Sequence, residues 1–285
     1  MQVELLKIIQ SIHSPIFDVL FVCITYLGSE FFYFAFITYF YWHVNKRFGL
    51  KLGLVFLASV YLNTIFKELT AIKRPIGYPG IRSLAVSTAG GYSFPSGHAQ
   101  HATAFWGIIA CYYKSRKWDI IAIALIAAVS FSRLYLGVHW PLDVVGGIAI
   151  GLALVYVSLK AERFYYRLSI KKSFNIVCKM MISIVVPVLL LLIFRHHDIL
   201  IAMGTMSGML FGYFVEAEYI GYEAGNMQVH TKIITYLLGI SGLFIIYIGL
   251  SIMPFKTPFF TYMKYFILGV YITLFVPYVY KRITG

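Results

Sequence analysis

The chain has 285 residues, of which 60% are hydrophobic and only 12% are charged, and its mean hydropathy is +0.79. Soluble domains are roughly half apolar and about a quarter charged, so this composition excludes a soluble enzyme and a disordered chain. The formal net charge of +13 does not indicate nucleic acid as a partner, because most basic residues lie in short loops between apolar segments. There they fit the positive-inside pattern and contacts with anionic membrane lipids. The sequence therefore predicts an integral membrane protein.

The apolar segments define the predicted elements in chain order. Residues 2–12 place apolar side chains at helical spacing, without the marks of a signal peptide, and are expected to form an interfacial helix. Runs long enough to cross a hydrocarbon core of about 30 Å follow. They are expected at residues 16–42, 50–70, 98–113, 118–137, 141–160, 174–194, 199–216, 232–252 and 259–280. The predicted fold class is all-α, a polytopic transmembrane helical bundle.

The first of these runs is interrupted by Gly28, Ser29 and Glu30. It is therefore either one tilted span or two half-helices, and the chain has nine spans if it is single. Glu30 lies inside the apolar run, where it could pair with a cation of a nearby site or line a lateral entrance for substrate.

Loop charges predict the orientation. Eleven lysines and arginines lie in three loops on one face, at residues 43–51, 114–118 and 160–172. This face is expected to be cytoplasmic. The glycine- and proline-containing loop 71–97 is expected to lie on the opposite, extracytoplasmic face, together with the three polar clusters described next.

The first cluster runs from Lys67 to Pro75. A spacing of seven places Lys67 and Arg74 about two turns apart on one helix face, before Pro75 disrupts the helix. Two cations would then point the same way. An ordinary basic patch at the membrane interface would show the same pattern.

The second cluster is Pro95-Ser96-Gly97-His98, directly before an apolar helix. Ser96 is suited to the N-cap and Gly97 permits close backbone approach, so the first amides of the helix can bind an anion with His98 beside it. A capped helix that happens to carry a histidine is the alternative. His101 could join His98 on a metal, but no nearby carboxylate or cysteine completes the ligand set, so no metal is expected.

The third cluster runs from Ser132-Arg133 to His139 and Asp143. Pro141 favours a helix start just after His139, which places Asp143 about one turn below it. Asp143 can hold one imidazole nitrogen as N–H and leave the other free as a nucleophile, while Arg133 offers a planar fork suited to phosphate. A buried Arg–Asp pair with a structural histidine is the alternative.

Together the clusters supply three cations, two histidines, a histidine-orienting carboxylate and two helix N-termini on one face. A tetrahedral polyanion needs this combination, because phosphoryl transfer requires neutralised oxygens, an in-line nucleophile and an acid for the leaving oxygen. The sequence thus indicates phosphate chemistry.

The pattern K-x6-R-P, P-S-G-H and S-R-x5-H-x3-D, in this order, resembles the membrane type 2 phosphatidic acid phosphatase family, whose site is shared with vanadium haloperoxidases and glucose-6-phosphatases. The resemblance covers roughly residues 16–160 and implies a six-helix core. It also implies that His139 is a nucleophile that forms a phosphohistidine, that Asp143 orients it and that His98 is the general acid. The phosphate-holding residues implied are Lys67, Arg74, Ser96, Gly97 and Arg133, with no metal and no cofactor.

Residues 1–160 are accordingly expected to be a catalytic core, and residues 161–285 a transmembrane extension without a recognisable catalytic motif. In the extension, Gly204, Gly208 and Gly212 repeat at the spacing that lets helices pack closely, as Gly147 and Gly151 do in the core. These glycine faces are also candidates for contact between copies in a homo-oligomer. Three acids near the end of the glycine stripe are expected to be solvated at headgroup level, namely Glu216, Glu218 and Glu223.

The expected function is hydrolysis of a lipid phosphate in a cell membrane, with the site at the extracytoplasmic face. Candidate substrates are polyprenyl diphosphate, ranked first because of this placement, phosphatidylglycerol phosphate and phosphatidic acid. A phosphatase of a soluble ester, a transporter or binding protein for phosphate lipids, and a vanadium-dependent peroxidase are the alternatives. A transporter would need the cations, but not a His139–Asp143 pair opposite His98.

Overall fold

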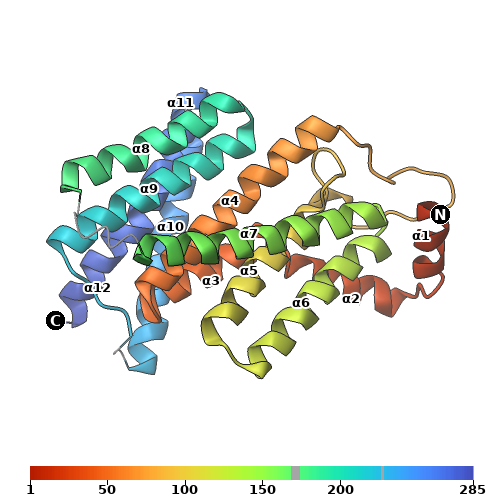
Figure 1. The fold of residues 1–285 in the computed structure, drawn as a ribbon, viewed down its shortest axis with the longest axis horizontal. Helices are drawn as coiled ribbons and strands as arrows, with labels where there is room; N and C mark the ends of the chain where they lie inside the picture. Colours follow the sequence, from red (N-terminus) through yellow and green to blue (C-terminus); the bar gives the residue numbers. More distant parts are fainter. Residues whose placement is uncertain (168–173, 226–227, 285) are drawn as a thin grey trace. The chain divides into compact units, whose positions relative to one another are not determined.

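The computed structural model describes residues 1–167, 174–225 and 228–284. Within these ranges all regular secondary structure is helical and no strand occurs, which confirms the all-α class (Figure 1). The loop between residues 71 and 96 is irregular apart from a short 3-10 helix, η1 (Val86–Thr88), as its composition predicts. An N-terminal helix, α1 (Gln2–Gln10), precedes the apolar elements.

Within the described ranges, seven helical segments are long and apolar enough to cross a membrane, so the chain is a multi-pass membrane protein. They are α4 (Lys46–Thr70), α6 (Arg116–Tyr135), α7 (Pro141–Arg167), α8 (Ile176–Ile193), α9 (His197–Tyr219), α10 (Val229–Ile252) and the continuous stretch α11 (Pro258–Val270), η2 (Tyr271–Phe275) and α12 (Val276–Thr284).

Two of the nine expected spans are not found as single membrane-crossing helices in the described residues. The first apolar run forms two helices, α2 (Pro15–Tyr26) and α3 (Glu30–His43), because the chain turns at residues 27–29. The bent pair α1 and α2, at 117°, would add an eighth span if it is counted as one. Helix α5 (Gly97–Tyr113) has 17 residues and rises only about 26 Å, which is short of the hydrocarbon thickness.

The chain divides into two compact units. The first unit combines Met1–Phe34 with Leu62–Leu168, and the second combines Ala35–Tyr61 with Ser169–Gly285. Packing therefore assigns residues 35–61 to the same unit as the C-terminal helices. The predicted division after residue 160 concerns function and stays a prediction.

In the first unit, α5 packs against both α6 and α7. The approach of α7 depends on its glycines: a Cβ at Gly147 would lie 2.6 Å from the Ser96 carbonyl oxygen, and one at Gly151 would lie 2.6 Å from the Thr103 Cβ. The glycine spacing in the core thus serves close helix packing, as predicted.

The N-terminal helix of the same unit is held in place by Gln10, whose amide donates to the carbonyl oxygens of Arg82 and Tyr135.

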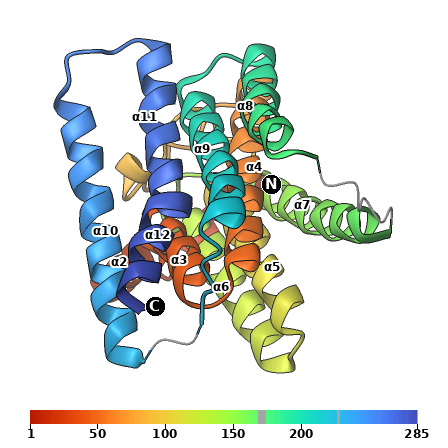
Figure 2. The same cartoon turned by 90° about the vertical axis from the view of Figure 1, so that its left-hand side faces the viewer.

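In the second unit, α9 packs along α11, as Figures 1 and 2 show. Side chains at Gly204, Gly208 and Gly212 would collide with Tyr262, Phe266 and Thr273 respectively. Both glycine faces are therefore covered inside the chain. Neither face is free for the contact between copies that the sequence suggested.

Glu216 corrects an expectation from the sequence. Glu218 and Glu223 are exposed as expected, but Glu216 is fully buried within the second unit. Its Oε2 lies 2.8 Å from the Lys46 Nζ, and its Oε1 accepts from the Tyr222 amide at 2.5 Å. The chain folds back after α9, so a residue at the end of that helix becomes enclosed.

We predict that Glu216→Gln lowers the unfolding temperature of the detergent-solubilised protein far more than Glu218→Gln. Breaking a buried ion pair from one side costs about 3–5 kcal/mol, because the remaining charge stays buried and uncompensated. The double variant Lys46→Met/Glu216→Leu should recover much of the loss. Equal unfolding temperatures for the two glutamine variants would show that the pair contributes nothing.

Candidate functional site

His139 and Asp143 form the centre of a polar cluster in the first unit. His139 lies in the short connection between α6 and α7, and Asp143 lies in the first turn of α7, as the sequence predicts. The His139 Nδ1 is 3.4 Å from the Asp143 Oδ2, and each side chain is only 2% exposed. The same Oδ2 accepts from the Trp140 amide at 2.7 Å and from the Ser93 Oγ at 2.5 Å. Asp143 is therefore held firmly and faces one ring nitrogen, which leaves Nε2 for chemistry.

Arg74 contacts this imidazole directly. Its Nη1 lies 2.8 Å from the His139 Nε2 and donates to the Val138 carbonyl oxygen at 2.9 Å. Its Nε and Nη2 donate to the carbonyl oxygens of Gly91 and Gly90, at 2.9 and 2.6 Å. Arg74 is thus an arginine fixed beside the Nε2 of His139.

The expectation that Lys67 and Arg74 share a helix face is wrong. Helix α4 ends at Thr70, and Ala71 adopts a φ of +48°, so Arg74 belongs to the following loop. A proline disfavours helical backbone in the residue before it, which is consistent with an earlier end of the helix. The two cations still converge, because the Lys67 Nζ donates to the Gly90 carbonyl oxygen at 3.4 Å.

Arg133 lies in the last turn of α6 and is fully buried. Its Nη1 donates to the Thr25 Oγ1 at 2.5 Å and to the Thr88 Oγ1 at 2.8 Å, and its Nη2 donates to the Thr88 carbonyl oxygen at 3.2 Å. The Arg133 Nε is buried without a hydrogen-bond partner among the described residues. A buried donor of a charged group in this state is suited to an anionic ligand.

The second polar cluster, residues 95–98, is hydrogen-bonded to the third cluster through the backbone. The Ser96 amide donates to the Asp143 carbonyl oxygen at 2.9 Å, and Ser96 occupies the N-cap position of α5. Its hydroxyl makes no capping bond, however, and is buried without a hydrogen-bond partner in the described chain. Gly97 approaches Asn63 closely, since a Cβ there would lie 3.1 Å from the Asn63 Oδ1. The free hydroxyl and the helix N-terminus form a further place for anion oxygens.

The surroundings keep His139 neutral. Burial, followed by the positive charges of Arg74, Arg133 and Lys67, lowers the pKa of the His139 imidazole well below its usual 6.5. Burial also lowers the pKa of Arg74, to about 10, against the attraction of Asp143. At neutral pH the site therefore holds an uncharged imidazole beside a charged guanidinium, and only an uncharged imidazole has a ring nitrogen with a free lone pair.

Sequence reasoning missed four polar residues that support the cluster. Ser93 bonds Asp143, and Thr25 and Thr88 bond Arg133. Asn63 donates to the Pro95 carbonyl oxygen at 3.2 Å and to the Gln100 Oε1 at 2.9 Å. An amide inside an apolar run was a usable signal for Asn63. The other three lie far along the chain from their partners, and nothing in their local sequence marks them.

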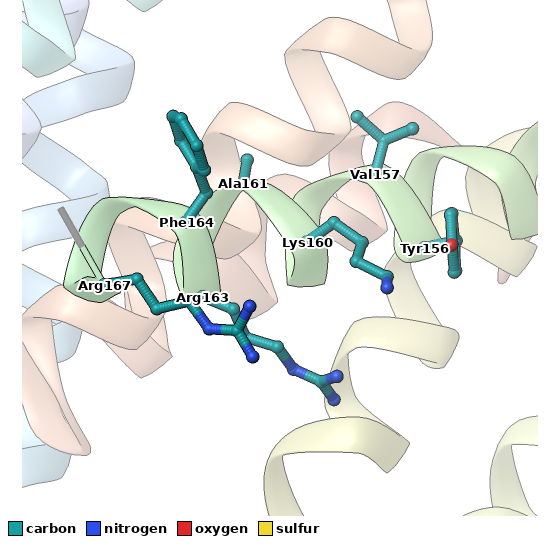
Figure 3. Close-up of a pocket in the computed structure, with 7 residues that line it drawn as sticks. All are labelled: Tyr156, Val157, Lys160, Ala161, Arg163, Phe164 and Arg167. Atoms are coloured by element: carbon teal, nitrogen blue, oxygen red, sulfur yellow. The ribbon is translucent and has the colours of Figure 1, made fainter.

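Among residues 1–167, 174–225 and 228–284, no group of three or more His, Cys, Asp or Glu side chains is placed to hold a metal ion. A surface pocket of about 460 Å³ lies at the far end of α7, about 20 Å along the helix from Asp143 (Figure 3). It is lined by Tyr156, Val157, Lys160, Ala161, Arg163, Phe164 and Arg167. The pocket contains none of the predicted site residues.

Fold and cluster together define a polytopic membrane protein with a buried, cationic site built around a histidine. Residues 48–167 match the family model of the PAP2 superfamily, and residues 200–284 match that of the PAP2 superfamily phosphatase, transmembrane extension. The chain belongs to the PAP2 superfamily.

Known proteins similar to this chain include two curated relatives. An undecaprenyl-diphosphatase of Sulfolobus acidocaldarius is 33% identical over 119 residues, which are 41% of this chain and 57% of the relative. The human sphingosine-1-phosphate phosphatase 2 is 29% identical over 144 residues, which are 48% of this chain and 36% of the relative. The chain thus spans little more than half the length of the first of these relatives and about a third of the second.

A solved structure shows the same fold. The crystal structure of Aquifex aeolicus LpxE aligns with a TM-score of 0.50 at 26% identity, over 56% of this chain and 94% of that one.

We predict that the His139 ring stays neutral as the pH falls through 6.5 and takes up a proton only well below that value. The lowered pKa requires this sign, because a depressed histidine pKa extends the neutral form to lower pH. Histidine nitrogen chemical shifts in a pH titration, with the His139 signal assigned by its loss in His139→Gln, would measure it. In Arg74→Gln the midpoint of the His139 titration should rise only part of the way towards 6.5, because burial lowers the pKa of His139 more than the charge of Arg74 does. A midpoint at or above 6.5 in the unchanged protein would contradict the prediction.

Proposed function

We propose that the chain is a membrane lipid phosphatase whose catalytic residues lie within residues 1–160. One observation carries this proposal: the buried His139 ring lies 3.4 Å from Asp143 and 2.8 Å from Arg74, within a cluster that also holds Arg133 and the Ser96 hydroxyl, which has no partner among the described residues. Family membership supports it, and so do the names of relatives that act on lipid phosphates.

The proposed reaction has two displacements. The His139 Nε2 attacks phosphorus, a P–N bond forms, and the P–O bond to the leaving group breaks while His98 donates a proton to that oxygen. Water then attacks phosphorus, the P–N bond breaks, and His98 takes up the proton that the water loses, which releases phosphate and restores both histidines. An arriving phosphate oxygen would accept the Arg74 hydrogen that now points at Nε2, so binding itself would free the nucleophile. Lys67, Arg74, Ser96, Gly97 and Arg133 hold the phosphate in this scheme, and no metal takes part.

The proposed substrates carry lipid tails, because the site lies at the ends of membrane helices, where a headgroup can reach it while the tail stays in the bilayer. Polyprenyl diphosphate ranks first, ahead of phosphatidylglycerol phosphate and phosphatidic acid. The Sulfolobus relative supports this order, and the sphingosine-1-phosphate relative adds sphingoid phosphates to the substrates worth testing.

We predict that the purified protein releases phosphate from at least one member of a panel of prenyl, glycerolipid and sphingoid phosphates, and that EDTA leaves the rate unchanged. His139→Ala should abolish turnover, whereas Asp143→Asn should leave a small remainder, because it spoils the tautomer but keeps the shape. A rate lost in EDTA and restored by a divalent ion would contradict the mechanism. Lipid phosphate binding without release would favour the transporter, and release from soluble esters alone would favour the soluble-ester phosphatase.

We further propose that the site faces the extracytoplasmic side of a cell membrane, because the three basic loops lie at the opposite helix ends. Cysteines introduced at Ser87 in the loop 71–96 and at Ser115 before α6, each in a chain with Cys23, Cys111 and Cys178 replaced, test it. We predict that a membrane-impermeant thiol reagent labels position 87 and not position 115 in intact cells. The reverse pattern would overturn the orientation and the argument for an outer-leaflet substrate.

A further inference from the structure

Helix α2 and the turn after it contact the site, although they precede the residues that match the PAP2 family model. Thr25 is fully buried in the last turn of α2, and its hydroxyl accepts from the Arg133 Nη1 at 2.5 Å. Gly28 follows in the turn, where its amide donates to the Thr25 carbonyl oxygen at 2.9 Å. The break in the first apolar run therefore lies beside the cluster.

The contacts of Arg133 are confined to one end of its guanidinium. Thr25 and Thr88 together occupy the hydrogens of Nη1, and the Thr88 carbonyl oxygen takes one hydrogen of Nη2. The Nε hydrogen and the other Nη2 hydrogen have no acceptor in the part of the chain that the structure describes, and in arginine these two form a parallel fork along one edge. A fork of this kind fits two oxygens of one phosphate. The two threonines thus hold the guanidinium at Nη1 and at one hydrogen of Nη2. The edge formed by Nε and the other Nη2 hydrogen stays available for an anion.

Gly28 approaches the other proposed catalytic partner. A Cβ at this position would lie 2.8 Å from the His98 Cδ2 and 2.7 Å from a Val129 methyl carbon. Real Cβ atoms do not approach other carbons so closely, so a side chain here would displace both the His98 ring and the Val129 side chain. Because Gly28 has no side chain, the His98 ring can occupy its observed position.

We propose that Thr25 and Gly28 are positioning residues of the active site: Thr25 fixes the phosphate-binding edge of Arg133, and Gly28 sets the position of the His98 ring. This inference rests on the proposed function. It extends the site to a helix that lies outside the matched family region and carries none of the three motifs.

The first arm of the test compares Thr25→Val, which removes the hydroxyl at nearly constant volume, with Thr25→Ser, which restores it. Thr103→Val is the matched control, because the Thr103 hydroxyl is buried in the same unit but donates only to the Ala99 carbonyl oxygen of its own helix. In Thr25→Val we expect the affinity for inorganic phosphate, measured as a competitive inhibitor and by thermal shift, to fall about tenfold, the size of one hydrogen bond to a charged group. Thr25→Ser should recover most of it, and Thr103→Val should match the wild type.

The second arm compares Gly28→Ala with Gly249→Ala, whose new methyl group meets no atom within 4 Å. Displacing a general acid slows substrates with poor leaving groups most. Gly28→Ala should therefore lower kcat for a lipid phosphate at least tenfold, with a much smaller loss for p-nitrophenyl phosphate, whose phenolate leaves without a proton. Gly249→Ala should leave both rates unchanged.

The outcomes separate this inference from the proposed function. If the wild type releases phosphate but Thr25→Val behaves like Thr103→Val, the positioning role of Thr25 is wrong while the phosphatase stands. If Gly28→Ala lowers both rates equally, its effect is structural and its positioning role is wrong. A wild type that neither binds inorganic phosphate nor releases it would overturn both proposals.

Discussion

The two arginines of the site donate to oxygen atoms that carry no formal charge. Arg74 donates to carbonyl oxygens of Val138, Gly90 and Gly91, and Arg133 donates to hydroxyl and carbonyl oxygens of two threonines. The carboxylate in contact with His139 is Asp143, which also accepts from a serine and a backbone amide. Dipoles satisfy the donors of a buried cation without neutralising its charge. The site therefore keeps an excess of positive charge that a polyanion can balance, and this excess also favours the neutral form of His139.

This constraint explains why the site needs chain segments far apart in the sequence. Neutral acceptors must be brought to each guanidinium, and one helix cannot supply them. Helix α2 contributes Thr25, and the loop before α5 contributes Thr88, Gly90 and Gly91, while the start of α7 supplies the Asp143 carboxylate to His139. The motif residues provide the charges and the His139 imidazole. The residues between the motifs provide the geometry.

Local relations could be predicted from the sequence, whereas contacts between distant segments could not. The His139–Asp143 pair followed from a spacing of four at a helix start, and the helix beginning at Gly97 followed from a proline, a serine and a glycine before an apolar run. Arg74 was misplaced because the helix ends before it, although the loop returns it to the same site. Thr25 was missed because its partner lies 108 residues away. Glu216 was misjudged for the same reason, since burial at a helix end depends on where the chain turns next.

The pair of Lys46 and Glu216 also sets an order of events during synthesis. The two residues are 170 positions apart, and the second unit takes its first residues from before most of the first unit. At a synthesis rate of about 5–20 residues per second, Lys46 enters the membrane environment roughly ten seconds or more before its carboxylate exists. Until then residues 35–61 have no C-terminal helices to pack against, so Lys46 depends on water or lipid phosphate for a partner. The second unit is completed only when residues 169–285 have been synthesised, and interruption of synthesis before Glu216 leaves the Lys46 ammonium group without its carboxylate partner.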